Sequence, residues 1–276
     1  MRFFLTMLCL AALPLRGEAQ SAPGFELFPH DTPFRSPLAD PAEPRLFLSG
    51  LRVRRPAGEF GAAFLGVGHD FGLLRRHSAN PDHGWQLSIF GSADSLFNLD
   101  LPGDALVNTD YRIGFPLTWS NAPVSARMRL YHQSSHLGDE LILGGNAPQR
   151  LDMSFEAIDV LIAWERTRWR LYGGASHVLT TRQESYKGST LHAGFDYVGP
   201  PAYLGLRATM GLDVKWLEAA DWRAGVSAKA GLKLGRESLE RRGVTLLVEL
   251  YDGFAPFGQF FAEDWRYYGA RLQFDF

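Results

Sequence analysis

Residues 204–216, LGLRATMGLDVKW, alternate strictly between apolar side chains and small or polar ones. One row holds Leu204, Leu206, Ala208, Met210, Leu212, Val214 and Trp216, and the other holds Gly205, Arg207, Thr209, Gly211, Asp213 and Lys215. Only the two-residue period of a β-strand separates side chains in this way. The long apolar row and the charged opposite row invert the plan of a soluble sheet, which indicates a strand whose apolar face meets lipid.

Segments of this kind recur along the chain, and we predict about twelve. Most have ten or more residues, which exceeds the usual strand length in soluble proteins and matches a tilted strand that crosses a membrane. A secreted β-sandwich or lipocalin-like barrel is the alternative, but its polar face would lie outside and its strands would be shorter. We therefore predict an all-β fold, a transmembrane antiparallel β-barrel over residues 45–276. The predicted strands cover residues 45–55, 59–72, 84–97, 106–119, 123–136, 151–165, 168–180, 189–199, 202–217, 221–234, 242–252 and 264–276.

The residues before the barrel divide into two parts. Residues 1–19 combine an early Arg, an apolar run and the small-x-small pattern Gly17-x-Ala19, which predicts a secretory signal peptide. The only cysteine, Cys9, lies in that run, so the mature chain has no cysteine chemistry. Residues 20–44 are rich in proline and are expected to form an irregular periplasmic segment. Beyond the signal, no apolar run is long enough for a transmembrane helix.

Loop lengths and aromatic residues orient the predicted barrel. All seven tryptophans lie near strand ends, as expected for interfacial girdles. Long links follow the fifth, seventh and eleventh strands and tight turns precede the fifth, seventh and ninth, which places both termini in the periplasm. The first hairpins fit this rule less well, because RPAGE is short and LRRHSANPDHG is long.

The stretch at 131–140, YHQSSHLGDE, gathers two histidines, two serines and two acids. The apolar row of its strand continues into His132, Ser134 and His136, which are therefore predicted to face lipid near the cell surface. Polar groups on a lipid-facing row cost free energy unless they are paired or lie near the interface, which makes them candidates for function. A histidine beside a serine can act as a general base while the hydroxyl attacks an ester carbonyl.

Further residues complete this hypothetical ester-cleaving site. Glu156 lies on the outward row of the next strand and is able to fix the imidazole tautomer. Backbone N–H groups of Gly138, Gly144 and Gly145 are candidates for stabilising an oxyanion. Asp139 and Glu140 are weak candidates for a Ca²⁺ ion, and a solvated loop end is the simpler interpretation.

The chain also resembles known families. PLADPAEPR, DYRIGFPLT, YHQSSHLGDE and LDMSFEAIDVL resemble a family of bacterial outer-membrane proteins with no assigned function. The C-terminal strand, ending in Phe276, is similar to the signal that the barrel-assembly machinery recognises in outer-membrane barrels.

His132-x-Ser134 is similar to the outward-facing His-x-Ser of outer-membrane phospholipase A and lipid A 3-O-deacylase. The resemblance implies a third residue, an Asn or a Glu, which the family's spacing places at Asn146 and the outward row at Glu156. The sequence departs from the phospholipase pattern, because Ser135-His136 follows where that enzyme has Asn and Gly.

Two other functions remain open. A narrow pore is one, since Arg127, Arg129, Asp110 and Arg112 are predicted to face the lumen, although paired charges commonly fill a barrel of this size. A structural or assembly role is the other. We expect outer-membrane lipids as partners, leave a homodimer open, and expect no cofactor other than Ca²⁺. A net charge of −2 gives no reason to expect nucleic acid.

Overall fold

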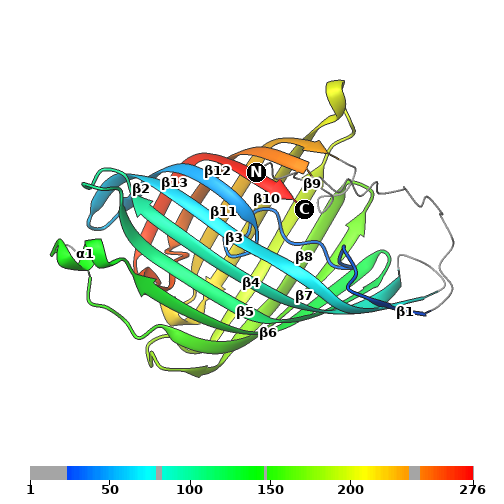
Figure 1. Cartoon of the computed structure of the whole chain (residues 1–276), viewed down its shortest axis with the longest axis horizontal. Coiled ribbons are helices and arrows are strands. Elements are labelled where there is room, and N and C mark those ends of the chain that lie inside the picture. The colour runs from blue at the N-terminus through cyan, green and yellow to red at the C-terminus, as the bar shows by residue number, and fades with distance from the viewer. Residues whose placement is uncertain (1–23, 79–82, 146–147, 236–242, 276) are drawn as a thin grey trace, which may run out of the picture.

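The computed structural model describes residues 24–78, 83–145, 148–235 and 243–275. Twelve antiparallel strands, β2 to β13, form a closed barrel, because β13 pairs with β2 and β3 pairs with β4 (Figure 1). The predicted fold class and strand number are confirmed. The strands are β2 (Leu46–Arg55), β3 (Gly58–His77), β4 (His83–Asn98), β5 (Ala105–Asn121), β6 (Val124–Leu137), β7 (Ser154–Arg166), β8 (Trp169–Thr181), β9 (Ser189–Val198), β10 (Leu206–Leu217), β11 (Arg223–Gly235), β12 (Gly243–Phe254) and β13 (Asp264–Asp275).

Alternation along the strands places apolar side chains outside, whereas the interior is mixed. Polar side chains line it on strands such as β10, and β2 and β3 contribute Phe47, Leu51 and Phe64 to a buried apolar cluster. On β10, Arg207 and Asp213 are buried while Met210 and Trp216 are exposed. Trp265 departs from the predicted girdle: it is buried and packs against Phe260. The reason is that Trp265 belongs to the inward row of β13, whereas Tyr268 and Leu272 belong to the lipid-facing row. The alternation thus assigns Trp265 to the interior.

The barrel has two ends, which we name by the elements that lie there. The α1 end carries the helix α1 (Asp139–Leu143) and the 3-10 helices η2 (Glu218–Ala220) and η3 (Gly258–Phe260) (Figure 1). The terminal end is where β2 begins and β13 ends, and it carries η1 (Tyr203–Gly205). Within the described ranges, no helix has the length and apolarity to cross a membrane.

The longest strand, β3, extends past β2 at the terminal end. The additional short strand β1 (Gly24–Leu27) pairs with its last four residues, 74–77. Much of LRRHSANPDHG, which is long for a turn, therefore belongs to β3 and β4. Phe276, the expected assembly signal, and the signal peptide lie outside the described residues.

Residues 29–45, which we call the lumen segment, run into the barrel: His30 and Asp31 are exposed, whereas most of residues 34–45 are buried inside it. Glu43 accepts two hydrogen bonds from Arg127, at 2.7 and 2.8 Å, and both side chains are buried. The ring of Phe34 lies 4.5 Å from the guanidinium carbon of Arg170, and Leu38 N donates to Asp196 Oδ1 at 3.1 Å. The sequence predicts an irregular segment here but places it in the periplasm. The lumen holds it instead, because its acids neutralise cations on the barrel wall.

Residues 255–263, which we call the mouth loop, fold inward at the α1 end. Gly258 N donates to Asp110 Oδ2 at 3.1 Å. Gln259 Nε2 donates to the backbone oxygens of Ser135 and Leu151, at 2.7 and 2.9 Å, and Phe260 is buried. The loop therefore connects β12 and β13 to the opposite wall across the mouth of the barrel.

Candidate functional site

The outer wall at the α1 end carries a polar group within an otherwise apolar surface. His132 and Ser134 follow Leu130 on the outward row of β6, as predicted, and Leu130 is exposed. Across the strand pair, His132 lies opposite Glu156 of β7, and Ser134 lies opposite Ser154. The register of two neighbouring strands therefore brings together residues that are far apart in the sequence.

A hydrogen-bonded chain links three of these strands. His132 Nδ1 lies 2.9 Å from Glu156 Oε1, and Thr180 Oγ1 of β8 donates to Glu156 Oε2. The His132 and Glu156 side chains are 40% and 50% exposed, so both are accessible from outside the barrel. When Nδ1 carries the proton and donates it to Glu156, Nε2 is left as an acceptor.

The Ser134 hydroxyl makes no hydrogen bond to His132 or to any other group in the described part of the chain. Residues two apart on a strand lie roughly 6.5–7 Å apart at Cα on the same face. Side-chain rotation therefore decides whether the hydroxyl meets the imidazole, and catalytic hydrogen bonds often close only when substrate binds.

A second outward pair lies on the neighbouring strands. His177 Nδ1 of β8 is 3.0 Å from Ser189 Oγ of β9. Within the described ranges no carboxylate contacts the His177 ring, whereas Glu156 contacts His132. The His177–Ser189 pair is therefore a matched reference for the first site, with the same residue types but without the acid.

Not every residue predicted for the site has the expected geometry. The backbone N–H groups of Gly138, Gly144 and Gly145 already donate inside the protein, to Val107 O, Glu140 O and Ile142 O. They are therefore not free to stabilise an oxyanion. Gly138 has a packing role instead, because a Cβ there would lie 1.9 Å from the Leu106 carbonyl oxygen. Asn146 lies outside the described residues.

The two acids considered for Ca²⁺ open the helix α1. Asp139 and Glu140 are both exposed in its first turn. Among the described residues, neither belongs to a group of three His, Cys, Asp or Glu side chains close enough to share an ion. The Ca²⁺ hypothesis for these two acids stays a prediction.

The four residues predicted for the lumen lie there, and each has a partner. Arg127 and Arg129 both contact Glu43. Arg112 contacts Asp94 and the backbone of the lumen segment, while Asp110 accepts from the mouth loop. These charges are therefore engaged in holding the two inward segments.

Glu43 was not among the residues predicted from the sequence. Burial raises the pKa of its carboxyl, but the guanidinium groups of Arg127 and Arg129 outweigh burial and hold that pKa well below its ordinary value. Glu43 is therefore charged at neutral pH. The excess of arginine in the predicted lumen rows, set against the acids of PLADPAEPR, was the signal that could have identified it.

Comparisons with known proteins agree with this fold. Outer-membrane phospholipase A from Escherichia coli is similar with a TM-score of 0.58 and 14% identity, over 90% of this chain and 95% of that chain. The calcium-bound dimer of the Salmonella typhi outer-membrane phospholipase is similar with a TM-score of 0.56 and 13% identity, over 86% of this chain and 94% of that chain.

A KdgM porin in complex with disordered oligogalacturonate is similar with a TM-score of 0.47 and 12% identity, over 84% of this chain and 99% of that chain. None of the curated proteins matches the sequence. At these identities the likeness shows the fold alone, that of an integral outer-membrane β-barrel. A family model does match nearly all of the barrel and the lumen segment, at residues 25–276, and the chain therefore belongs to DUF1207, a family described as of unknown function.

Proposed function

We propose that this protein is a serine hydrolase of the outer membrane that cleaves acyl esters of membrane lipids. Ser134 is the nucleophile, His132 the general base and Glu156 the residue that orients the imidazole. The observation that carries the proposal is the 2.9 Å contact between His132 Nδ1 and Glu156 Oε1, on the same outer face as Ser134.

The chemistry follows from this contact. With Nδ1–H donated to Glu156, the Nε2 lone pair takes the Ser134 proton as Oγ forms a bond to the ester carbonyl carbon. The imidazolium returns that proton to the departing alcohol as the carbon–oxygen bond of the ester breaks. Water then attacks the acyl-serine by the same route, which releases the fatty acid and restores Ser134. Glu156 stabilises the imidazolium in both steps.

The surroundings of the site suit a lipid ester. Ile113 lies beside His132 on the neighbouring strand β5, and Phe115 and Leu130 are the next residues of the two outward rows toward the terminal end. All three are exposed apolar side chains, which suit acyl chains. A lipid ester lies at the boundary between acyl chains and headgroups, and the polar residues here begin where the apolar rows end. We further infer from the long α1-end loops that this end faces the cell exterior and that both termini are periplasmic.

An open pore is less well supported than the hydrolase. The lumen segment and the mouth loop both occupy the barrel interior, and ion pairs with the wall hold the first of them. We therefore place the chemistry on the outer wall.

The experiment is fatty-acid release from bacterial phospholipid and from lipid A, by refolded protein in detergent micelles, with Ca²⁺ or with chelator. The unaltered chain should release fatty acid. Ser134→Ala should abolish release, whereas Ser189→Ala, which alters the outward serine that contacts His177, should leave it unchanged. Heat-modifiable migration on gels checks that each barrel is folded. Absence of release from every lipid under both conditions contradicts the proposal.

A further inference from the structure

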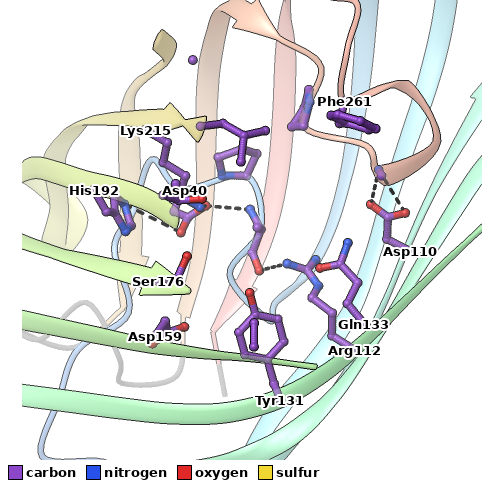
Figure 2. A pocket seen from close by; sticks show the side chains of 18 of the residues that line it. Asp40, Asp110, Arg112, Tyr131, Gln133, Asp159, Ser176, His192, Lys215 and Phe261 are labelled. Atoms are coloured by element: carbon purple, nitrogen blue, oxygen red, sulfur yellow. Dashed lines mark hydrogen bonds and ion pairs between the residues drawn. The ribbon is translucent and has the colours of Figure 1, made fainter. Parts of the chain in front are cut away.

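A chamber lies inside the barrel, apart from the outer wall. Asp40, Pro41 and Ala42 of the lumen segment line it, as do Phe257 and Phe261 of the mouth loop. Figure 2 shows Asp40 and Phe261 among the lining side chains. Its volume is about 140 Å³. Since one water needs roughly 10–15 Å³ on this measure, the chamber has room for a ligand of about ten non-hydrogen atoms.

The charged groups of the chamber wall already have partners. Lys215 Nζ lies 2.6 Å from Asp40 Oδ1, and His192 Nε2 lies 2.5 Å from Asp213 Oδ2. Arg129 contacts Asp159 at 2.6 Å, and Arg112 contacts Asp94. Among the described residues, Asp110 has no ion-pair partner but accepts hydrogen bonds from two neutral donors, Gly258 N and Asn108 Nδ2. An ionic ligand would therefore have to break a buried ion pair or displace these donors to gain a counter-charge, which is costly.

Five neutral polar side chains of the chamber wall, in contrast to the charged ones, have no hydrogen-bond partner within the part of the chain that the structure describes. Each can both donate and accept. These residues, from β6, β8, β9 and the loop between β8 and β9, are Tyr131, Gln133, Ser176, Tyr186 and Thr190. Figure 2 shows Tyr131, Gln133 and Ser176 around one space.

The aromatic part of the wall supplies the remaining surface. Tyr186 packs on Phe155 at 4.8 Å and on Phe261 at 5.0 Å between ring centroids, which places rings beside the unpartnered hydroxyls. Rings next to neutral hydrogen-bonding groups suit a molecule with polar hydroxyls and apolar C–H faces. A charged or wholly apolar molecule would leave one half of this lining unmatched.

From the paired charges, the free neutral groups and the size, we propose that the chamber is a binding site for a neutral polyhydroxylated molecule of about the size of a monosaccharide. This site is independent of the proposed lipid hydrolysis. The lumen segment is part of it, since residues 40–42 line the chamber.

The test is calorimetric titration of the folded protein with glucose, galactose and mannitol, and with glucuronate and glucosamine as charged counterparts. The protein is held in a polyoxyethylene detergent, because detergents with sugar headgroups would compete. A neutral compound should bind more tightly than its charged counterparts. Gln133→Leu and Ser176→Ala should each weaken that binding by about three- to tenfold, the loss of one hydrogen bond.

Ser134→Ala, which alters only the outer wall, is the control and should leave sugar binding unchanged. Gln133→Leu should conversely leave lipid hydrolysis unchanged, so that failure of one proposal is distinguishable from failure of the other. Absence of heat for all three neutral compounds overturns the proposal. It is equally overturned by tighter binding of a charged counterpart, or by binding that Gln133→Leu and Ser176→Ala do not affect in folded protein.

Discussion

The two faces of β6 differ in how their polar residues are satisfied. On the lumen face, Arg127 is 2% exposed and contacts both carboxylate oxygens of Glu43. On the outer face, the His132 side chain is 40% exposed and contacts Glu156 through Nδ1 alone. Ser134, the next residue of the same outward row, has no hydrogen-bond partner among the described residues. The buried pair holds the lumen segment, whereas the outer residues include an accessible nucleophile and base.

This contrast teaches where to expect function and where to expect stability. A charge buried opposite its counter-charge is costly to remove from one side only, because the remaining partner stays desolvated. An exposed imidazole next to lipid contributes little to stability, and its presence in an apolar row calls for another reason. Changes on the outer face should affect activity alone, and changes on the lumen face should affect unfolding.

The largest effect is expected on the outer face. His132→Ala removes the general base and should lower the initial rate of fatty-acid release by about 10²–10⁴-fold. The denaturant midpoint of unfolding, followed by tryptophan fluorescence, should not change. A parallel loss of rate and stability would show that His132 is a structural residue, and the contrast between the faces would fail.

On the lumen face, Glu43→Ala leaves Arg127 and Arg129 without their shared carboxylate. The free energy of unfolding should fall by about 3–5 kcal/mol, measured by denaturant titration in micelles. Asp252→Ala is the matched control, because it removes a carboxylate from the exposed pair with Arg266, and its cost should be about 1 kcal/mol or less. Equal costs for the two variants would mean that the lumen segment contributes no more stability than a surface pair.

The smallest effect concerns Thr180, which donates to the far oxygen of Glu156. Thr180→Val keeps the shape of the side chain but loses the hydrogen bond, so the rate of release should fall by about three- to tenfold with stability unchanged. Rescue by Thr180→Ser, which restores the hydroxyl, checks that the hydrogen bond is responsible. A rate unaffected by Thr180→Val would limit the site to His132, Ser134 and Glu156.

The sequence predicts the barrel well because period-two alternation is a local property, repeated in every strand. The same rule predicts the outward row of His132 and Ser134 and places Glu156 on the outward row of the next strand, as one of two candidate partners beside Asn146. The pairing of His132 with Glu156 depends on the register between the two strands, which alternation within one strand does not determine. Trp265 is the exception to the predicted girdle, because position near a strand end does not determine which face of the strand a side chain occupies.

The lumen segment and the mouth loop could not be predicted in the same way. Their positions depend on contacts such as Glu43 with Arg127 and Gln259 with Ser135, between residues far apart in the chain. No local period encodes these contacts. The partner-free chamber residues Gln133 and Ser176 were likewise recognisable only once both inward segments were in place.

The most direct measurement of the central claim is covalent labelling of the folded protein with a long-chain fluorophosphonate, followed by peptide mass spectrometry. This reagent reacts with a serine whose hydroxyl is activated by a base and loses fluoride as the Ser Oγ–phosphorus bond forms. The account predicts a single adduct on Ser134 that is lost in His132→Ala and retained in Ser189→Ala. An unlabelled Ser134 in folded protein, or an adduct on Ser189 instead, would contradict it.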